Sequence, residues 1–241
     1  MTIAPDAVPD DSVVRVQVTL AARGGCRDAL ADGIGQVAEH AATRLGAAAR
    51  VTVLTQIDDD PFPAANPVAR PFQAVLEVQG AADAGPEPLL AALDGIGECL
   101  EPVAHLDLSG VLVGAPQEII PCALTPVRYQ YFMRRRAGTS RVDYLDHYFH
   151  HHSQFGFATP GIEGYTQFHV DPAASALAAA RLGLGAVVCD SVSELHLASL
   201  ATFLGALAES GYGGDAIADE ETFVDRESSV SITCDSRGVT A

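Results

Sequence analysis

The sequence predicts an α+β fold in which two β-α-β-β-α-β repeats of one chain face each other as a pseudo-dimeric barrel. Three observations support this prediction. The 241 residues are 48% hydrophobic, which is enough for a buried core. Runs that alternate apolar and polar residues, as strands do, are interspersed with alanine-rich runs at helical spacing. The same order of elements occurs on both sides of the PCALTP segment at 121–126, which we interpret as a linker.

The first repeat is expected over residues 13–120, after an acidic N-terminal segment (1–12) that we expect to be flexible. Alternating residues predict its strands. Leu30, Ile34, Val37 and Ala41 share one helical face, and a glycine follows them at the end of that helix. In chain order, the expected elements are a strand at 13–20, a helix at 28–46, strands at 51–57 and 72–78, a helix at 89–100 and a strand at 106–113.

The second repeat is expected over residues 127–241 and has the same order. Its elements are a strand at 127–133, a helix at 140–155, strands at 162–170 and 187–197, a helix at 199–210 and a strand at 230–234, with an extra alanine-rich helix at 172–184. This order is that of the ferredoxin-like fold, a four-stranded antiparallel sheet with helices on one face. Two such sheets in one chain would most simply cover each other.

Charge and cysteine content exclude several classes of function. The formal net charge is −17, which argues against binding to nucleic acid or to an anionic membrane surface. No apolar run is long enough for a membrane helix, and the N-terminus lacks a signal pattern, so we expect a cytoplasmic protein. The sequence has no lysine, which excludes Schiff-base chemistry. Five widely spaced cysteines indicate free thiols.

The helix expected at 140–155 carries four histidines within six positions. Ser140 is a suitable N-cap residue. Helical spacing places Val142, Leu145, Phe149 and His152 on one face, so that His152 points to the interior beside Tyr148. Partial burial would shift the pKa of His152 from about 6.5 and suit it to proton transfer, with Tyr148 as a catalytic partner. A hydrogen-bonded core histidine is the simpler alternative.

The remaining histidines lie on flanking or polar positions. His147 and His151 are four residues apart and could bind a divalent metal ion, but a third ligand would have to come from elsewhere in the chain. A solvated polar face explains them more simply. We therefore predict no metal, and keep His147 and His151 only as weak candidates.

Neighbouring strands supply candidate substrate-binding residues. Tyr129 and Tyr131 share one face of the strand at 127–133, and Tyr165 lies on the strand at 162–170. Glu194 lies on the strand at 187–197, and Arg134 could hold an anionic group of a substrate. Each of these residues could equally be an ordinary strand residue.

The segment RRRAGTSRVDYLDHYFHHH, followed by PGIEGYTQFHV, resembles the EthD family. CDSVSELHLASLATFLGAL and ADEETFVDRESSVSI are similar to the later strand, helix and "DE-x-x-F-x-D" close of that family, so the resemblance covers residues 127–234. The first half looks like a degenerate ferredoxin-like repeat without this signature. In the match, Tyr144 takes the first aromatic position of the helix, Tyr148 the usual tryptophan, His152 the characteristic histidine and Asp225 the terminal aspartate.

Departures from the family pattern imply a different substrate pocket. They are Tyr148 in place of tryptophan, Ser191 in place of a glycine, and Ser153 with Gln154 in place of Ala-Pro.

The resemblance implies the dimeric α+β barrel fold, whose superfamily includes cofactor-free oxygenases, polyketide cyclases, isomerases and haem enzymes. We therefore expect a cofactor-independent enzyme that acts on a small hydrophobic or aromatic molecule, as an oxygenase, cyclase or isomerase, with His152 as acid or base. One alternative is a non-enzymatic small-molecule-binding or structural module. Another is a haem-binding protein of chlorite-dismutase-like architecture. Either a monomer or a homodimer fits the sequence.

Overall fold

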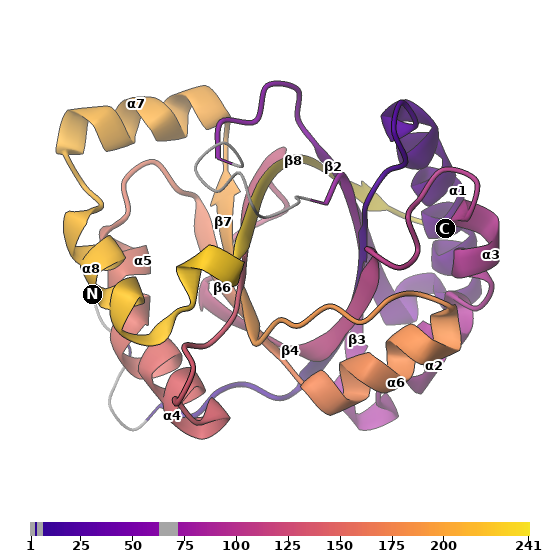
Figure 1. Cartoon of the computed structure of the whole chain (residues 1–241), viewed down its shortest axis with the longest axis horizontal. Helices are drawn as coiled ribbons and strands as arrows, with labels where there is room; N and C mark the ends of the chain where they lie inside the picture. The colour runs from indigo at the N-terminus through magenta and orange to yellow at the C-terminus, as the bar shows by residue number, and fades with distance from the viewer. Residues whose placement is uncertain (1–2, 4–6, 63–71) are drawn as a thin grey trace.

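Antiparallel strands close into a single barrel, and helices cover its outside (Figure 1). This computed structural model describes residues 3, 7–62 and 72–241. Parts of the expected N-terminal segment (1–2 and 4–6) and of the loop after the second strand (63–71) lie outside the described residues. The strand order around the barrel is β1-β3-β2-β8-β5-β7-β6-β4.

Each half of the barrel is one ferredoxin-like sheet. The first contains β1 (Val13–Leu20), β2 (Ala49–Gln56), β3 (Ala74–Ala81) and β4 (Gly110–Ile120) in the order β4-β1-β3-β2. The second contains β5 (Val127–Met133), β6 (Gly164–Val170), β7 (Ser191–Leu197) and β8 (Val230–Val239) in the order β6-β7-β5-β8. Pairing of β2 with β8 and of β4 with β6 closes the barrel. The predicted intrachain pseudo-dimeric α+β barrel is therefore confirmed.

Helices α1 (Arg27–Leu45), α2 (Glu87–Ala92) and α3 (Ile96–Leu100) cover the first sheet, together with α6 (Pro172–Leu182) from the second repeat (Figure 1). The single helix expected at 89–100 is wrong, because it breaks where Gly95 adopts a φ of +87°. Aliphatic side chains from these helices fill the space above the sheet, among them Leu30, Ile34, Leu90 and Leu182. The first half therefore has a solid core between its sheet and its helices.

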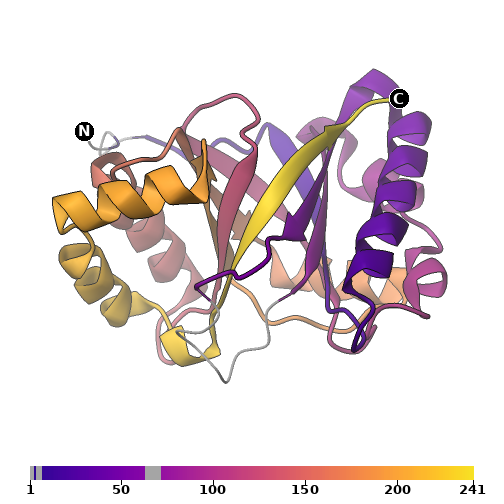
Figure 2. The same cartoon turned by 90° about the horizontal axis from the view of Figure 1, so that it is seen from above.

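The other helices of the second repeat lie on the opposite side of the barrel (Figure 2). They are α4 (Arg141–Asp146), the π-helical segment η4 (His147–His152), α5 (Ser153–Ala158), α7 (Leu200–Ser210) and α8 (Gly214–Phe223). The described part of the chain also contains the short 3-10 turns η1 (Gly46–Ala48), η3 (Ala82–Ala84) and η5 (Arg226–Ser228). Sequence periodicity did not predict α8.

The helical face predicted for the histidine helix needs a correction. Val142 is 76% exposed, whereas the rings of Tyr144 and Tyr148 are fully buried in line with His152. Tyrosine buries more apolar surface than valine, so the two tyrosines determine which side of α4 faces the sheet. The π-helical turn then adds a residue to the turn that holds the histidines, which shifts the helical phase for the residues after it.

The barrel lumen carries one polar pattern twice. An Arg-x-Gln sequence lies on the first strand of each repeat and a glutamate on the third, and the register aligns each glutamine with the glutamate of its own repeat. The residues are Arg15, Gln17 and Glu77 in the first repeat and Arg128, Gln130 and Glu194 in the second. The two halves thus share inward-facing residues as well as topology.

Within the described ranges, no helix is both long and apolar enough to cross a membrane. All five cysteines are free thiols, of which Cys189 and Cys234 are buried.

Candidate functional site

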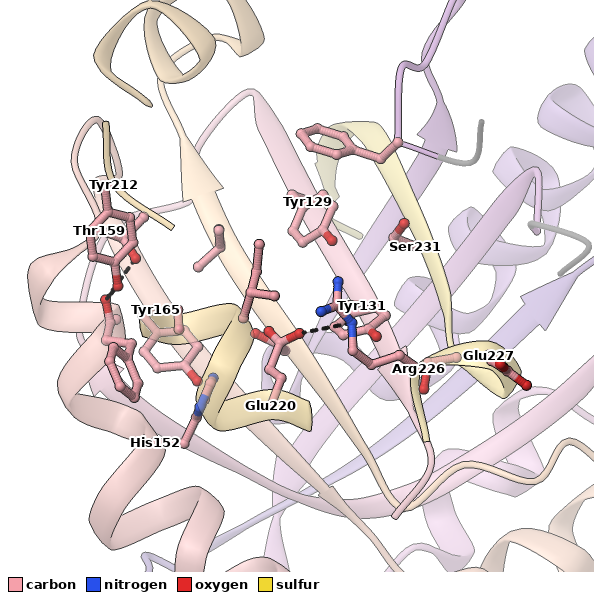
Figure 3. A pocket seen from close by; sticks show the side chains of 18 residues that line it. Tyr129, Tyr131, His152, Thr159, Tyr165, Tyr212, Glu220, Arg226, Glu227 and Ser231 are labelled. Atoms are coloured by element: carbon pink, nitrogen blue, oxygen red, sulfur yellow. Dashed lines mark hydrogen bonds and ion pairs between the residues drawn. The ribbon is translucent and has the colours of Figure 1, made fainter. Parts of the chain in front are cut away.

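A cavity of about 540 Å³ lies between the outer face of the second sheet and the helices that cover it (Figure 3). The sheet contributes Tyr129 and Tyr131 from β5 and Tyr165 from β6. The helical side contributes His152 from η4 and Glu220 from α8. Further lining residues are Phe62, Phe155, Gly156, Thr159, Ser193, Leu195, Tyr212, Ala216, Ile217, Arg226, Glu227, Ser229 and Ser231. The equivalent space in the first half is filled by aliphatic side chains.

The phenol groups of the cavity remain protonated at neutral pH. Alternation along β5 places Tyr129 and Tyr131 on the face that points away from the lumen. Burial raises the pKa of Tyr131 and of Tyr165 to about 12, and raises that of Tyr129 as well. These hydroxyl groups can therefore donate hydrogen bonds to oxygen atoms of a bound molecule.

His152 is the histidine that the fold brings to this cavity, and it is paired with Asp219 of α8. Its Nδ1 donates to Oδ2 of Asp219 over 2.7 Å, and the ring is largely buried. Burial lowers the pKa of His152, although the hydrogen bond to Asp219 opposes this shift. Nε2 makes no hydrogen bond within the described part of the chain. This arrangement defines the tautomer of the ring and leaves Nε2 to act on a ligand.

Glu220 faces the cavity beside His152 (Figure 3). Burial raises the pKa of Glu220 to about 7. The positive charge of Arg226, whose Nε lies 3.8 Å from Oε2 of Glu220, opposes this rise, and the negative charge of Asp219 adds to it. Sequence reasoning did not assign a role to Asp219 or Glu220. The signal was present, because both belong to the DE pair in ADEETFVDRESSVSI.

A turn rich in glycine directs α8 back over the cavity. Gly211 and Gly213 adopt φ values of +63° and +134° between α7 and α8, in the left-handed region that glycine tolerates. The hydroxyl of Tyr212 in the same turn donates to the carbonyl oxygen of Phe155 over 2.6 Å. The turn thereby fixes one edge of α8 to α5.

Tyr148 lies behind the cavity wall rather than on it. Its ring is fully buried, and burial raises its pKa well above the usual value. Gln167 donates to the backbone carbonyl of Tyr148 over 2.8 Å, and the neighbouring Tyr144 bonds to Ser191 through their hydroxyls over 2.7 Å. Through these bonds the two tyrosines hold α4 and η4 against strands β6 and β7.

Two other sequence candidates lie away from this cavity. Arg134 lines a separate cavity of about 440 Å³ with Arg135, Asp190 and Asp225. Glu194 points into the barrel lumen, where it pairs with Arg15. His147 and His151 lie beside Asp219 near the molecular surface, outside the cavity lining.

Comparisons with known proteins agree with this architecture. The EthD domain family matches residues 136–227. No curated protein sequence matches the chain. The fold is similar to that of an anthrone oxidase-like protein, with a TM-score of 0.62 and 11% identity over 100% of this chain and 98% of the other.

Two further solved structures share the fold. A provisionally named monooxygenase from Lactobacillus acidophilus has a TM-score of 0.52 and 11% identity, over 95% of this chain and 96% of its own. A chlorite dismutase variant from Candidatus Nitrospira defluvii has a TM-score of 0.51 and 9% identity, over 93% and 92% of the two chains. At these identities, the likeness concerns the fold alone.

Proposed function

Because residues 136–227 of this chain carry an EthD domain, we propose that the protein is an enzyme that removes a proton from a small, largely apolar aromatic molecule bound in the cavity beneath α8. The observation that carries this proposal is the pairing of His152 with Asp219 at the wall of a cavity lined by phenols. The proposed place of action is the cytoplasm.

His152 would accept the proton at Nε2. Asp219 holds Nδ1 over 2.7 Å, which keeps the ring oriented as the proton moves. On the sheet side, the hydroxyls of Tyr129, Tyr131 and Tyr165 can donate to an oxygen atom on which negative charge develops. A cavity with apolar walls and a few such polar groups suits an aromatic ketone or phenol.

Removal of a proton from such a molecule gives an electron-rich enolate or phenolate. This anion is a common first intermediate for oxygenation, cyclisation and isomerisation, so the proposal concerns the step that the three reactions share. The name of the anthrone oxidase-like structure supports an enolisable aromatic ketone as the first compound to test.

The charges of the cavity lining do not fit haem as a bound cofactor. His152 could serve as an axial ligand, but the two negatively charged propionates of haem are best compensated by cationic side chains. Among the described lining residues, Glu220 and Glu227 are acidic, and the one guanidinium, Arg226, already interacts with Glu220 and Glu221. We therefore derive no step that uses haem.

Deuterium exchange tests the proposal directly. Anthrone in D₂O is incubated with the protein, and loss of the ring CH₂ signal is followed by NMR against the uncatalysed rate. We expect catalysed exchange that falls by about 100-fold or more in His152→Gln, as for the loss of a general base. The matched control is His150→Gln in the same turn, which should exchange at the wild-type rate.

Two results would contradict the proposal. Wild-type exchange by His152→Gln would show that the histidine is not the base. Tight binding of anthrone without exchange would instead favour a binding module without chemistry.

A further inference from the structure

We propose that His147, His151 and Asp219 form a binding site for a divalent transition-metal ion, with Zn²⁺ as the best fit. This site lies on the solvent side of the histidine turn and is distinct from the cavity that His152 lines. It needs no assumption about the reaction.

The two distances from Asp219 to the imidazoles are close to the ligand spacing around a tetrahedral ion. Nε2 of His147 lies 3.1 Å from Oδ1 of Asp219, and Nε2 of His151 lies 3.6 Å from the same oxygen. All three ligand atoms lie within 4.8 Å of one another. Metal–ligand bonds of about 2.0–2.1 Å at tetrahedral angles place ligand atoms about 3.3 Å apart. An ion could therefore enter with small rotations of the side chains.

The fold supplies the third ligand that the sequence pattern alone lacks. His147 and His151 are successive members of one helical row in η4, and their ring centroids lie 4.7 Å apart. Asp219 comes from α8, which packs against η4 after the glycine-rich turn. A carboxylate thus stands opposite two imidazoles, a ligand set that zinc commonly takes.

The exposure of the ligands leaves one coordination position open. The side chain of Asp219 is only 11% exposed, whereas those of His147 and His151 are 32% and 58% exposed. Three protein ligands with an open side toward solvent describe a site that keeps a water molecule as its fourth ligand. The set of two neutral imidazoles and one carboxylate favours late transition metals over Mg²⁺ or Ca²⁺.

Asp219 would connect the ion to the cavity. Nε2 of His147 lies 3.1 Å from Oδ1 and 3.2 Å from Oδ2 of this carboxylate, and Nε2 of His151 faces Oδ1. Oδ2 also accepts the hydrogen bond from Nδ1 of His152 over 2.7 Å. His152 is therefore an outer-sphere partner that orients the ligating carboxylate. Because the three ligands join η4 to α8, a bound ion would also hold α8 against the histidine turn.

Metal titration of tag-free, chelator-treated protein tests the site. Zn²⁺ is titrated in competition with a chromophoric chelator, and Co²⁺ is used to detect the visible absorption of a four-coordinate ion. We expect one ion per chain and a rise in Tm on binding. His151→Gln should weaken binding by more than the 10–100-fold that loss of an outer-sphere partner costs. His151 is largely exposed, so this variant should fold normally.

His150→Gln is the matched control, since His150 lies in the same turn but bonds to Asp146 and to the carbonyl of Ala7 instead. It should bind Zn²⁺ with wild-type affinity. Equal affinities of wild type and His151→Gln would overturn the proposal, as would an equal loss in His150→Gln. Zinc affinity is measured without substrate, so this outcome is independent of the exchange assay.

Discussion

Arg15, on the first strand of the N-terminal repeat, donates from Nη1 to Oε1 of Glu194, on the third strand of the C-terminal repeat, over 2.6 Å. The equivalent pair in the opposite sense, Arg128 with Glu77, is also 2.6 Å long. None of the four side chains is more than 6% exposed. Gln130 donates to both carboxylates and links the two pairs. The repeats are thus joined by crossed ion pairs inside the barrel.

Glu77→Gln should destabilise the barrel strongly. Burial opposes ionisation, yet Arg128 and Arg15 together hold the pKa of Glu77 at about 2. Its removal leaves two buried guanidinium groups with one carboxylate, which typically costs about 3–5 kcal/mol. Urea unfolding measures the loss. Glu101→Gln breaks the exposed pair with Arg23 and should cost about 0–1 kcal/mol. Similar losses for both variants would refute the role of the lumen network.

The free energy of unfolding should fall as the pH drops below about 6.5. Burial lowers the pKa of both His169 and His196 to about 3, with smaller contributions from Arg141 and Arg128 respectively. The unfolded chain binds protons below about 6.5 that the folded chain excludes, so stability is lost as the pH falls toward 3. Glu220, whose pKa is raised to about 7, offsets part of this loss between about pH 7 and 4.5, and Glu77 adds a further loss below about 4.5.

Urea titrations at several pH values between 7.5 and 5 measure this slope. Replacement of either histidine by glutamine should reduce it by up to about 1.4 kcal/mol per pH unit. A slope that stays unchanged in both variants would show that these histidines are not buried in the neutral form.

Gly156→Ala should impair binding of an aromatic molecule in the cavity. A Cβ at this position would lie 2.2 Å from Cδ1 of Tyr165, so either the ring moves into the cavity or α5 moves away from the sheet. Such overpacking typically costs about 1–3 kcal/mol. Thermal unfolding measures the loss of stability, and titration with anthrone measures the loss of affinity. Gly205→Ala on α7, which meets no atom within 4 Å, should leave both unchanged or raise stability slightly.

Tyr212→Phe should loosen α8. The variant loses the 2.6 Å hydrogen bond to the carbonyl of Phe155, worth about 0.5–1.5 kcal/mol. Hydrogen exchange should therefore become faster in the amides of α8, by up to about tenfold, while those of α1 on the other side of the barrel stay unchanged. Equal protection of α8 in the two proteins would contradict a fastening role for this tyrosine.

Most strand positions could be predicted closely because strands in a barrel still alternate apolar and polar residues. The strand expected at 106–113 is wrong in its bounds, since β4 runs from Gly110 to Ile120. The strands at 13–20 and 127–133 agree with β1 and β5 residue for residue. Periodicity also grouped Tyr129 with Tyr131 and separated them from their neighbours. Periodicity does not distinguish the strand face that points to the lumen from the outer face, because both faces are buried. Glu194 was therefore predicted to bind substrate, although it lies inside the barrel.

The part of the site that could not be predicted from the sequence lies in α8. Among its residues only Phe223 is buried, so the segment GDAIADEETF gives almost no amphipathic signal. Asp219 is brought to His152 by the turn that contains Gly211 and Gly213, a tertiary contact across 67 positions in sequence. Helical phasing placed His152 at the interior, but the partner that orients it required the three-dimensional fold.

One chain thus combines a first half with a packed aliphatic core and a second half with a cavity, and this has an evolutionary consequence. In a homodimer, every substitution occurs in both halves, so a residue that improves a binding cavity also alters the packing of the partner. Here a change at Tyr129 or Gly156 leaves Leu30 and Ile34 untouched on the other side of the barrel. Substitutions in the second half can therefore change which ligand binds while the first half maintains stability. A symmetric homodimer cannot separate these two requirements.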